Sequence, residues 1–381
     1  MSDTATSSVT DSAVLAAAAD EPIAPQNPMP HRKVIRSWLK PMAQRNTLLA
    51  LGLLVVDYAL FLGLISAVVA VSSLWLKLLF GLMAGFVIGR LFIIGHDACH
   101  QSLTEHRDLN KVLGRIAFLP SLTPYSLWDV GHNVVHHGYT CLKGTDFVWE
   151  PLTPAEYEAL SPVDRVLQRL YRSGWAPGLY YMIEIWWKRE FFPSEKHMPT
   201  RRAIFTRDSQ LTLGAGAVWL LALAIAAFAT GQSLLTLWFF GFAVPFFFWC
   251  SMIGFVVYVH HTHEKISWHN DKLAWSKAQP FVSTTVHLLM PLRLGALMHH
   301  IMEHTAHHVD MSIPLYHLKK AQDKLEHMLP ERIVIQQFSW RWYFDTARKC
   351  KLYCFERQAW LDFKGRVTAF PRRLHPIPTA A

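Results

Sequence analysis

Residues 91–100 read LFIIGHDACH and join the end of a long apolar run to a pair of histidines, His96 and His100. The run begins near Thr47 and is broken by Ser72, Ser73 and Lys77. It is long enough for two passes through a bilayer, because one helical pass takes about 20 residues. This stretch therefore predicts two transmembrane helices that end directly at a histidine cluster.

A second apolar run extends from Leu211 to about Val259 and is broken by TGQS at 230–233. It also has room for two helical passes. Both runs lie in a chain that is 51% hydrophobic and only 17% charged, a composition that favours the membrane class. We therefore predict an all-α integral membrane protein whose four transmembrane helices form two hairpins, 46–95 and 211–259.

The charge and cysteine content exclude several other classes. A net charge of +9 is compatible with nucleic-acid binding, but the chain has no basic stripe interleaved with aromatic residues and no helix-turn-helix signature. Anionic lipid headgroups explain the excess better, and no nucleic-acid partner is expected. Five cysteines without a CxxC pair indicate reduced thiols rather than a disulfide framework or a cysteine-ligated metal.

The basic residues predict how the chain is oriented. Five of them precede the first span without an intervening acid: Arg32, Lys33, Arg36, Lys40 and Arg45. The positive-inside rule places this segment in the cytoplasm, and an even number of passes returns the chain to the same side. We expect an integral protein of a bacterial inner membrane, with both termini and the active site in the cytoplasm.

The resulting domain organisation has six parts. Two segments have a more detailed prediction. Residues 316–329 are expected to be helical, and residues 178–192 are expected to form either a helix on the bilayer surface or an ordinary packed helix. The parts are a disordered, basic cytosolic tail (1–45), the first hairpin (46–95), a cytosolic helical cap (96–210), the second hairpin (211–259), the rest of the cap (260–335) and an irregular basic C-terminal tail (336–381).

Three histidine clusters share one spacing pattern: HDACH at 96–100, HNVVHH at 132–137 and HTAHH at 304–308. A fourth group, HHTH at 260–263, directly follows the second apolar run. The ends of the second and fourth spans meet at one membrane face, so clusters far apart in the sequence are expected to meet there. The clusters therefore predict a single site.

Helical geometry indicates how these histidines point. Residues four apart on a helix are neighbours, so His96 and His100 are expected to face one way. His132 and His136 are expected to stack, with His137 about 100° further round. The third cluster is expected to occupy an arc of about 100°, which spans His304, His307 and His308.

Nine imidazoles are too many for one metal ion and suit two ions with open positions. Imidazole binds iron, zinc, copper and nickel, but catalytic zinc usually takes three protein ligands, so the surplus favours a pair of irons. Such a centre at a membrane surface indicates oxygen chemistry on a lipid. The candidate ligands are His96, His100, His132, His136, His137, His304, His307 and His308, with either His261 or His263 as the ninth.

Other polar residues have weaker assignments. Acids in or near the clusters either orient imidazoles or are simply solvated: Asp97, Asp129, Asp146, Glu264, Glu303 and Asp310. Isolated histidines are interpreted as ordinary side chains: His106, His197, His269, His287, His317, His327 and His375. His299 and His300 rank between these and the clusters because they lie one turn before the third cluster.

With these clusters, the chain resembles the membrane-bound fatty acid desaturase family, whose three histidine boxes have the forms H-x(3 or 4)-H, H-x(2 or 3)-HH and H-x(2 or 3)-HH. The resemblance covers about residues 45–330. It implies a cytosolic cap over four transmembrane helices and an acyl chain in a tunnel beneath two irons. It implies the eight cluster histidines as ligands and favours His261 over His263, which remains a possible further ligand or an orienting residue.

The resemblance also implies a reaction and its partners. Dioxygen and two electrons remove two vicinal hydrogens from a fatty acyl lipid, and water is released. The electrons are expected from an external ferredoxin-like donor, because the sequence has neither an HPGG haem motif nor a CxxC pair. YVHHTH at 258–263 resembles the acyl-lipid Δ12/ω6 branch, but the second box has three intervening residues where typical Δ12 members have two.

Two alternatives remain open at this point. A related diiron hydroxylase or ketolase acting on a lipid, alkane or carotenoid carries similar boxes. A histidine-rich metal transporter is less consistent with the pattern, because transport requires ionisable residues near mid-bilayer. The spans offer little beyond Asp57 and Arg90.

Overall fold

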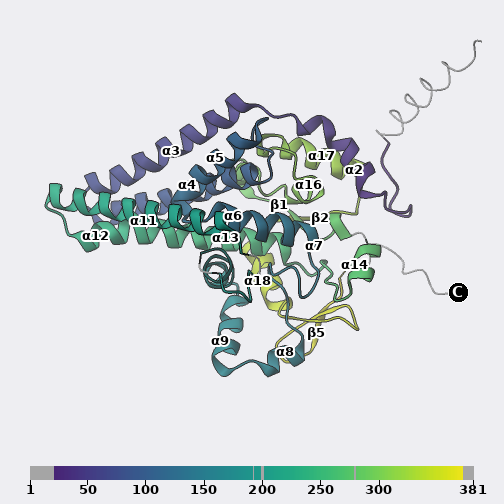
Figure 1. Cartoon of the computed structure of the whole chain (residues 1–381). Helices are drawn as coiled ribbons and strands as arrows, with labels where there is room; N and C mark the ends of the chain where they lie inside the picture. Colours follow the sequence, from purple (N-terminus) through teal and green to yellow (C-terminus); the bar gives the residue numbers. More distant parts are fainter. Residues whose placement is uncertain (1–20, 192, 199–200, 279, 372–381) are drawn as a thin grey trace, which may run out of the picture.

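The computed structural model of the protein describes residues 21–191, 193–198, 201–278 and 280–371. Within these residues, four helices are long and apolar enough to cross a membrane. They lie side by side and extend away from the rest of the chain (Figure 1). They are α3 (Thr47–Ala70), α4 (Leu74–Cys99), α11 (Ala203–Thr230) and a continuous helix made of α12 (Leu234–Trp238), η5 (Phe239–Ala243) and α13 (Val244–His261).

Two of these helices are longer than their apolar runs. Helix α4 continues past residue 95 to its end at Cys99, and α11 begins before the apolar run that starts at 211. The early part of α11 carries the buried carboxylate of Asp208, which lies 2.8 Å from Arg115 Nε and accepts the backbone N–H of Ser126 at 2.9 Å. Polar residues with internal partners thus extend these helices beyond the segments that hydropathy identifies.

A buried lysine joins the two connections at the far end of the helices. The Lys77 ammonium group donates hydrogen bonds to the carbonyl oxygen of Val68 and to Gln232 Oε1, both at 2.6 Å. Gln232 Nε2 in turn donates to the carbonyl oxygen of Val69 at 2.7 Å. The turn between α3 and α4 is therefore tied to the turn between α11 and α12.

The two charged residues that the sequence leaves within the spans pair with each other. Asp57 of α3 is fully buried, and its Oδ1 lies 2.8 Å from Arg90 Nη2 of α4. Its Oδ2 lies 2.7 Å from Nε2 of His299. A buried charge needs a partner of opposite charge or hydrogen bonds to offset its lost hydration. The pair therefore fixes the 294–302 segment against the membrane helices.

Shorter elements gather at one end of the four helices (Figure 1). They carry six of the nine candidate metal ligands. Their bounds are α2 (Arg32–Leu39), η1 (Lys40–Ala43), α5 (Arg107–Phe118), η2 (Leu119–Ser121), α6 (Tyr125–Asp129), η3 (Val130–His136), α7 (His137–Tyr139), α8 (Pro154–Ala159), α9 (Pro162–Tyr171), α10 (Pro177–Tyr180), η4 (Tyr181–Phe191), α14 (Lys272–Ala278), η6 (Pro280–Val282), β1 (Val286–Leu289), η7 (Pro291–Arg293), α15 (Leu294–Leu297), α16 (His304–Val309), η8 (Leu315–His317), α17 (Leu318–Met328) and β2 (Val334–Gln337).

The prediction of a disordered tail over 1–45 is wrong for the described part of that segment. Helix α2 buries Ile35 and Leu39 completely, and these residues are four apart and so share one face. The guanidinium of Arg32 donates a hydrogen bond to the carbonyl oxygen of His308 at 2.7 Å. Apolar packing and this long-range contact hold α2 against α16 and α17. Residues 1–20 lie outside the described residues.

The predictions of an irregular tail over 336–381 and of an all-α fold are also wrong. Helix α18 (Trp340–Lys349) precedes an antiparallel sheet of three strands, β3 (Leu352–Cys354), β4 (Ala359–Leu361) and β5 (Val367–Ala369). A second sheet pairs β1 with β2 in parallel. The described chain is nevertheless mostly helical.

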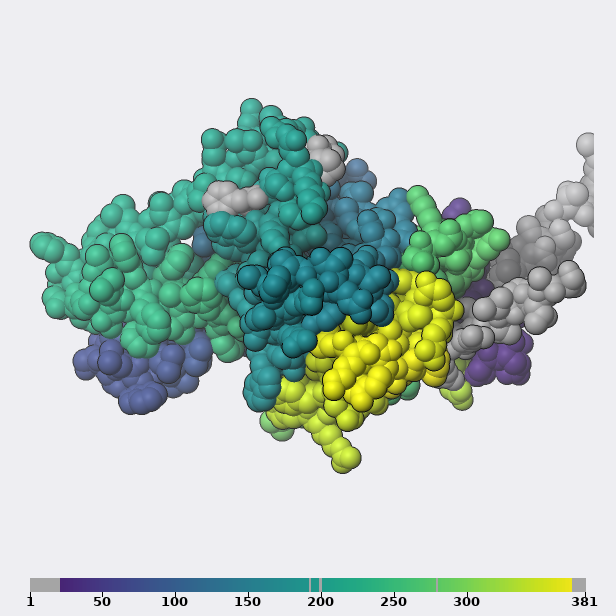
Figure 2. Space-filling model, turned by 90° about the horizontal axis from the view of Figure 1, so that it is seen from below, coloured from purple at the N-terminus to yellow at the C-terminus, as the bar shows by residue number. Residues whose placement is uncertain are grey.

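Aromatic burial explains why the C-terminal segment folds. Trp360 and Tyr353 have no exposed surface, and Trp360 Nε1 donates to the carbonyl oxygen of Ile266 at 3.1 Å. The ring of Phe363 contacts that of Tyr157 in α8, with centroids 4.9 Å apart. Figure 2 shows this segment, in yellow, lying against the teal segment that contains α8 and α9. Residues 372–381 lie outside the described residues.

The segment 178–192, which the sequence left between two interpretations, packs against α13 in its described residues. Tyr181 contacts the Trp249 ring at a centroid distance of 5.6 Å, and Trp186 contacts Phe246 at 5.0 Å. The next residue, Trp187, is half exposed. One face is thus that of a packed helix, and the predicted 316–329 helix is confirmed as η8 and α17.

Candidate metal centre

The first histidine pair lies at the C-terminal end of α4. His96 occupies the last turn and His100 follows the helix as its cap. Because four residues separate them, both rings lie on one side, and their Nε2 atoms are 3.3 Å apart. The geometry agrees with the one-sided arrangement that the spacing predicts.

The second cluster lies on the π-helix η3, whose turns are wider because its hydrogen bonds join residues five apart. His132 Nε2 consequently lies 3.0 Å from His137 Nε2. His136 points elsewhere, and its Nε2 lies 3.2 Å from that of His261. The prediction that His132 and His136 stack is therefore wrong. The letters HNVVHH alone do not distinguish an α-helix from a π-helix.

The third cluster, on α16, divides between two directions. His307 Nε2 lies 3.1 Å from His137 Nε2. His304 and His308 face the other way, with their Nε2 atoms 3.1 Å apart. One short helix therefore contributes to both sides of the site, which explains why a spread of about 100° within this cluster is useful.

His261 joins these histidines, whereas His263 does not. His261 ends α13, and its Nε2 lies 3.0 Å from His304 Nε2. His263 Nδ1 instead accepts the backbone N–H of Lys265 at 3.0 Å, and its Nε2 lies 3.4 Å from Gln336 Oε1. Of the two alternatives for the ninth candidate, the geometry therefore favours His261.

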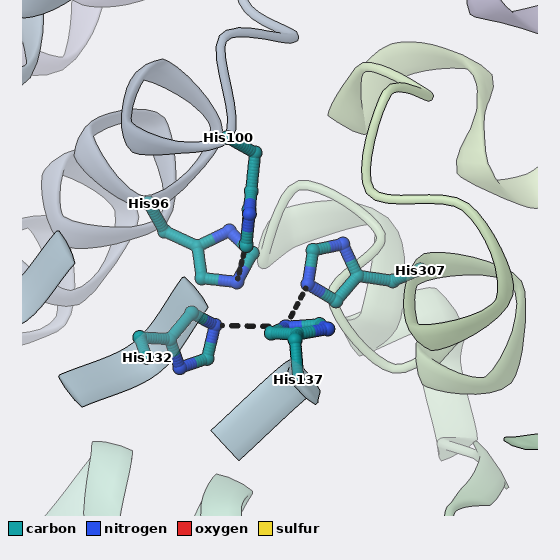
Figure 3. Close-up of side chains that lie close together, drawn as sticks. All are labelled: His96, His100, His132, His137 and His307. Carbon is teal, nitrogen blue, oxygen red and sulfur yellow. Dashed lines mark hydrogen bonds between the residues drawn. The ribbon is translucent and has the colours of Figure 1, made fainter. Parts of the chain in front are cut away.

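The nine imidazoles form two groups, and in each group the potential ligand atoms lie within 4.8 Å of one another. Figure 3 shows the rings of the first group pointing toward a common centre. They come from the end of α4, from η3 and α7, and from α16. The first group is His96, His100, His132, His137 and His307; the second is His136, His261, His304 and His308.

Hydrogen bonds between the rings do not explain the second group. His304 Nε2 lies 3.0 Å from that of His261 and 3.1 Å from that of His308, and His261 Nε2 also approaches His136. A neutral imidazole nitrogen offers either one proton or one lone pair, so it cannot form full hydrogen bonds with two rings. Two nitrogens that each lie about 2.1 Å from one metal ion, with an N–metal–N angle of about 90°, are about 3 Å apart. The spacing fits a shared metal ion.

Burial keeps these rings in the form that binds metal. Burial is the main cause that lowers their pKa well below the usual value near 6.5, and the charges of neighbouring histidines lower it further. Metal ions bind the neutral imidazole, so a low pKa favours binding. This applies to the group members outside the membrane helices: His100, His132, His137, His304, His307 and His308.

Asp146 holds His136 in place. Its Oδ1 lies 2.9 Å from His136 Nδ1 and also accepts the backbone N–H of Val148, while its Oδ2 accepts that of Cys141 at 2.9 Å. A carboxylate on the far nitrogen fixes the orientation of a metal-binding imidazole and raises its basicity. The Nε2 atom of His136 is thereby directed toward the second group.

Asp97 and Thr140 support two further rings. Asp97 Oδ1 lies 3.2 Å from His96 Nδ1. Thr140 Oγ1 lies 3.3 Å from His308 Nδ1, a contact that no sequence pattern indicates. The other four acids have different partners: Asp129 with Asn133, Glu264 with Lys349, Glu303 with His300, and Asp310 with Arg36.

Those of the ordinary histidines that the structure describes lie outside both groups. Several have other partners: His287 with Glu326, His317 with the carbonyl oxygen of Met42, and His197 with Ser194. His299 and His300, ranked between the two classes, pair with Asp57 and Glu303. His375 lies outside the described residues.

Two pockets reach the histidine groups. The first is largely apolar, with walls that include Phe92, Ile93, Trp128, Ile253 and Val256 beside several of the histidines. The indole of Trp128 stacks on the His132 ring at a centroid distance of 4.1 Å. The second pocket is more polar and includes His31, Arg32, His137, Thr140, Trp275 and His308. The centre therefore has one side suited to a hydrocarbon chain and another suited to polar groups.

The family follows from a comparison with known proteins. A family model described as fatty acid desaturase matches residues 72–340, which contain all three histidine clusters and both histidine groups. The chain belongs to the fatty acid desaturase family. The desaturase is therefore an enzyme of the oxidoreductase class. The family that its histidine boxes indicate is confirmed.

Curated relatives carry the names of acyl-lipid or fatty acid desaturases. The desaturase is 27% identical over 290 residues, 75% of its length and 80% of the relative, to an sn-1 oleoyl-lipid 12-desaturase from Picosynechococcus. It is 27% identical over 275 residues, 71% and 74% of the two chains, to an sn-1 acyl-lipid omega-3 desaturase (ferredoxin) from Nostoc. It is 26% identical over 312 residues, 80% and 68% of the two chains, to a chloroplastic omega-6 fatty acid desaturase from Glycine max.

Proposed function

We propose that this enzyme introduces a double bond into the fatty acyl chain of a membrane lipid or carrier. Two hydrogens leave adjacent carbons, and a carbon–carbon double bond remains. One dioxygen, two electrons and two protons from outside, together with these hydrogens, give two waters. The observation that carries the proposal is the apolar pocket that reaches two groups of imidazoles, seven of them buried and two partly buried. The printed names of the relatives support the same chemistry.

We assign the two histidine groups to two iron ions. Nine nitrogen donors, without an acid or cysteine among them, suit iron in preference to zinc, which takes fewer protein ligands at catalytic sites. When bound, a pair of irons supplies the reduction of dioxygen that cleavage of an unactivated C–H bond requires. The proposed ligands are His96, His100, His132, His137 and His307 for one ion, and His136, His261, His304 and His308 for the other.

The protein itself supplies orientation and a dry pocket. Asp146 and Asp97 fix two imidazoles, so the donor atoms need little rearrangement. Trp128 and Phe92 contact each other with ring centroids 5.7 Å apart and form part of the wall next to His132. This wall excludes water from the reacting carbons and limits the positions that an acyl chain can take.

We propose that the four apolar helices cross the membrane as two hairpins, 46–95 and 211–259, beneath a cytosolic cap. Helices α4 and α13 pack against each other, and His96 and His261 at their ends line the same pocket, which supports a single membrane face for the site. The basic residues between 32 and 45 support a cytoplasmic location for that face. A bacterial inner membrane is the proposed compartment.

We further propose that the electrons come from a ferredoxin-like protein. The name of the Nostoc relative includes ferredoxin. The acyl chain is proposed to occupy the apolar pocket, so the polar pocket stays free for the approach of an electron donor. Arg32 and Trp275 line this polar pocket. Trp275 Nε1 donates to the carbonyl oxygen of Thr140, whose hydroxyl contacts His308. A basic rim attracts an acidic carrier.

Lipid analysis of an expressing host tests the proposed function. We expect new unsaturated acyl chains by gas chromatography and mass spectrometry, and none with His136→Ala. The matched control is His197→Ala, which changes an imidazole outside both groups. Hydroxy or keto lipids without new double bonds would favour the hydroxylase or ketolase alternative instead.

A further inference from the structure

The apolar pocket has two polar groups that its histidines do not explain. Glu190 and Tyr181 both belong to η4 and line this pocket, with exposed fractions of only 5% and 3%. Within the described part of the chain, Glu190 Oε2 and the Tyr181 hydroxyl have no hydrogen-bond partner. The adjacent Arg189 is directed elsewhere, since it donates to the carbonyl oxygen of Glu184 and lies over the Phe147 ring.

Tyr181 lies away from His261 along the pocket. Tyr181 packs against Trp249, which precedes His261 in α13 by more than three turns, or roughly 18 Å along the helix axis. Ile253 and Val256 line the wall between these levels. The pocket therefore brings together imidazoles, hydrocarbon walls and a polar pair, and Tyr181 marks its end toward Trp249.

Both polar groups are hydrogen-bond donors. Burial raises the pKa of Glu190 to about 8, so its carboxyl is largely protonated at neutral pH and carries an O–H. Burial also raises the pKa of Tyr181, so its hydroxyl keeps its proton at neutral pH, and both side chains line the same pocket. A carbonyl oxygen has two lone pairs and can accept two such donors. A terminal methyl group leaves both donors unsatisfied.

We propose that Tyr181 and Glu190 bind the carbonyl oxygen of the acyl ester in the lipid substrate. The inference rests on the proposed desaturation and specifies how the enzyme selects the reacting carbons. With the ester held at this end, the aliphatic chain runs past Ile253 and Val256 toward the histidines. The reacting carbons are then set by their distance from the ester, because a fixed anchor fixes the part of the chain that reaches the centre.

Equilibrium binding to the metal-free, full-length protein tests the anchor without turnover. The probes are an acyl-ester glycerolipid and its ether analogue, which lacks only the carbonyl oxygen. We expect the wild type to bind the ester roughly tenfold more tightly, as for one lost buried hydrogen-bonding partner. Tyr181→Phe and Glu190→Leu should abolish this preference, whereas Glu190→Gln, which keeps a donor, should retain part of it. The control is Glu184→Gln on the same helix, where Glu184 contacts Lys188 and not the pocket.

Tyr181→Phe keeps the ring and removes only the hydroxyl, so it remains informative if Glu190→Leu fails to fold. An unchanged ester preference in both folded variants overturns the inference. A hydroxyl on the acyl chain has similar chemistry and defines a second arm. If the wild type prefers a hydroxylated ether lipid to the plain ether lipid, shows no ester preference, and loses the hydroxyl preference in Tyr181→Phe, the ester assignment is wrong.

Product analysis separates this inference from the proposed function. With acyl chains of different length, the wild type should place the double bond at a constant distance from the ester, and Tyr181→Phe should broaden that distribution. A constant distance from the methyl end would overturn the anchor while leaving desaturation intact. If the wild type gives no unsaturated product, the proposed function fails, and the binding comparison still decides whether the ester site exists.

Discussion

The Nε2 atoms of His132 and His137 lie 3.0 Å apart, although the two residues are five positions apart in the sequence. On an α-helix, residues five apart differ by about 140° and face different directions. The π-helix η3 brings them to one side. The three histidines of this box, with three residues between the first and second, therefore point in the same directions as those of a box with two intervening residues on an α-helix. The additional residue is accommodated by the wider turn.

Deletion of Val134 should therefore be tolerated. This residue is 60% exposed, and its removal leaves His132 three positions before His136 and four before His137. An α-helix then reproduces the present directions. We expect retained metal content and double-bond formation. Insertion of one alanine after Val134 is the contrasting variant and should remove both. Loss of metal in the deletion variant would show that the π-helix has another role.

Substitution of one histidine from each group should remove activity. His307→Ala and His136→Ala each delete a potential ligand of a different group. We expect at least about a 100-fold loss of product, because removing a ligand should cost more than removing a residue that only orients a ligand. Mass spectrometry should show less metal per chain. His263→Ala should retain metal, because His263 lies outside both groups. The reverse outcome for His261→Ala and His263→Ala would exchange their assignments.

Asp146→Ala should weaken metal binding without removing a ligand. The carboxylate accepts hydrogen bonds from two backbone N–H groups and contacts His136. Loss of such an orienting partner typically lowers metal affinity about 10–100-fold. Competition with a chelator measures this affinity. Glu264→Gln is the control, because Glu264 pairs with Lys349 away from the groups. Equal affinities in the two variants would remove the orienting role of Asp146.

The metal-free protein should lose stability as the pH falls below about 6.5. The pKa of His132, His137 and His307 is lower in the folded chain than the usual value near 6.5, mainly because of burial. The unfolded chain then binds more protons in this window, so the free energy of unfolding increases with pH. The contribution of these neutral, buried histidines to the free energy of unfolding is complete above about pH 6.5. Thermal unfolding from pH 8 to pH 5 checks the sign, and a transition temperature that does not fall would contradict it.

The Asp57 and Arg90 pair should show strong coupling. Replacing one partner leaves the other charge buried and unpaired, which typically costs about 3–5 kcal/mol. We expect Asp57→Leu and Arg90→Leu each to destabilise the protein and the double variant to be less destabilised than the sum of the two. Chemical unfolding in detergent micelles measures this difference. Additive effects would mean that the pair is not an energetic unit.

The positions of the membrane helices and the convergence of the clusters follow from simple sequence features. Long apolar runs locate α3, α4, α11 and α13 because hydropathy and length are sufficient for such helices. His96 and His100 face one way because their spacing matches an α-helical turn. The polar helix ends are missed, since Asp208 depends on a distant partner, Arg115.

Other features depend on contacts that a local pattern does not contain. The direction of His136 requires the π-helix, and its orientation requires Asp146, ten positions later. Burial of Tyr353 and Trp360 turns a basic C-terminal segment into a folded sheet. The Thr140 contact with His308 joins residues 168 positions apart. Such long-range contacts decide the details of the site, whereas local spacing decides which residues are candidates.

Anomalous diffraction at the iron edge, from crystals of the purified chain, tests the central claim most directly. We predict two peaks: one among His96, His100, His132, His137 and His307, and one among His136, His261, His304 and His308. A single peak, or peaks at other residues or only at the zinc edge, would contradict the assignment of two irons to these histidines.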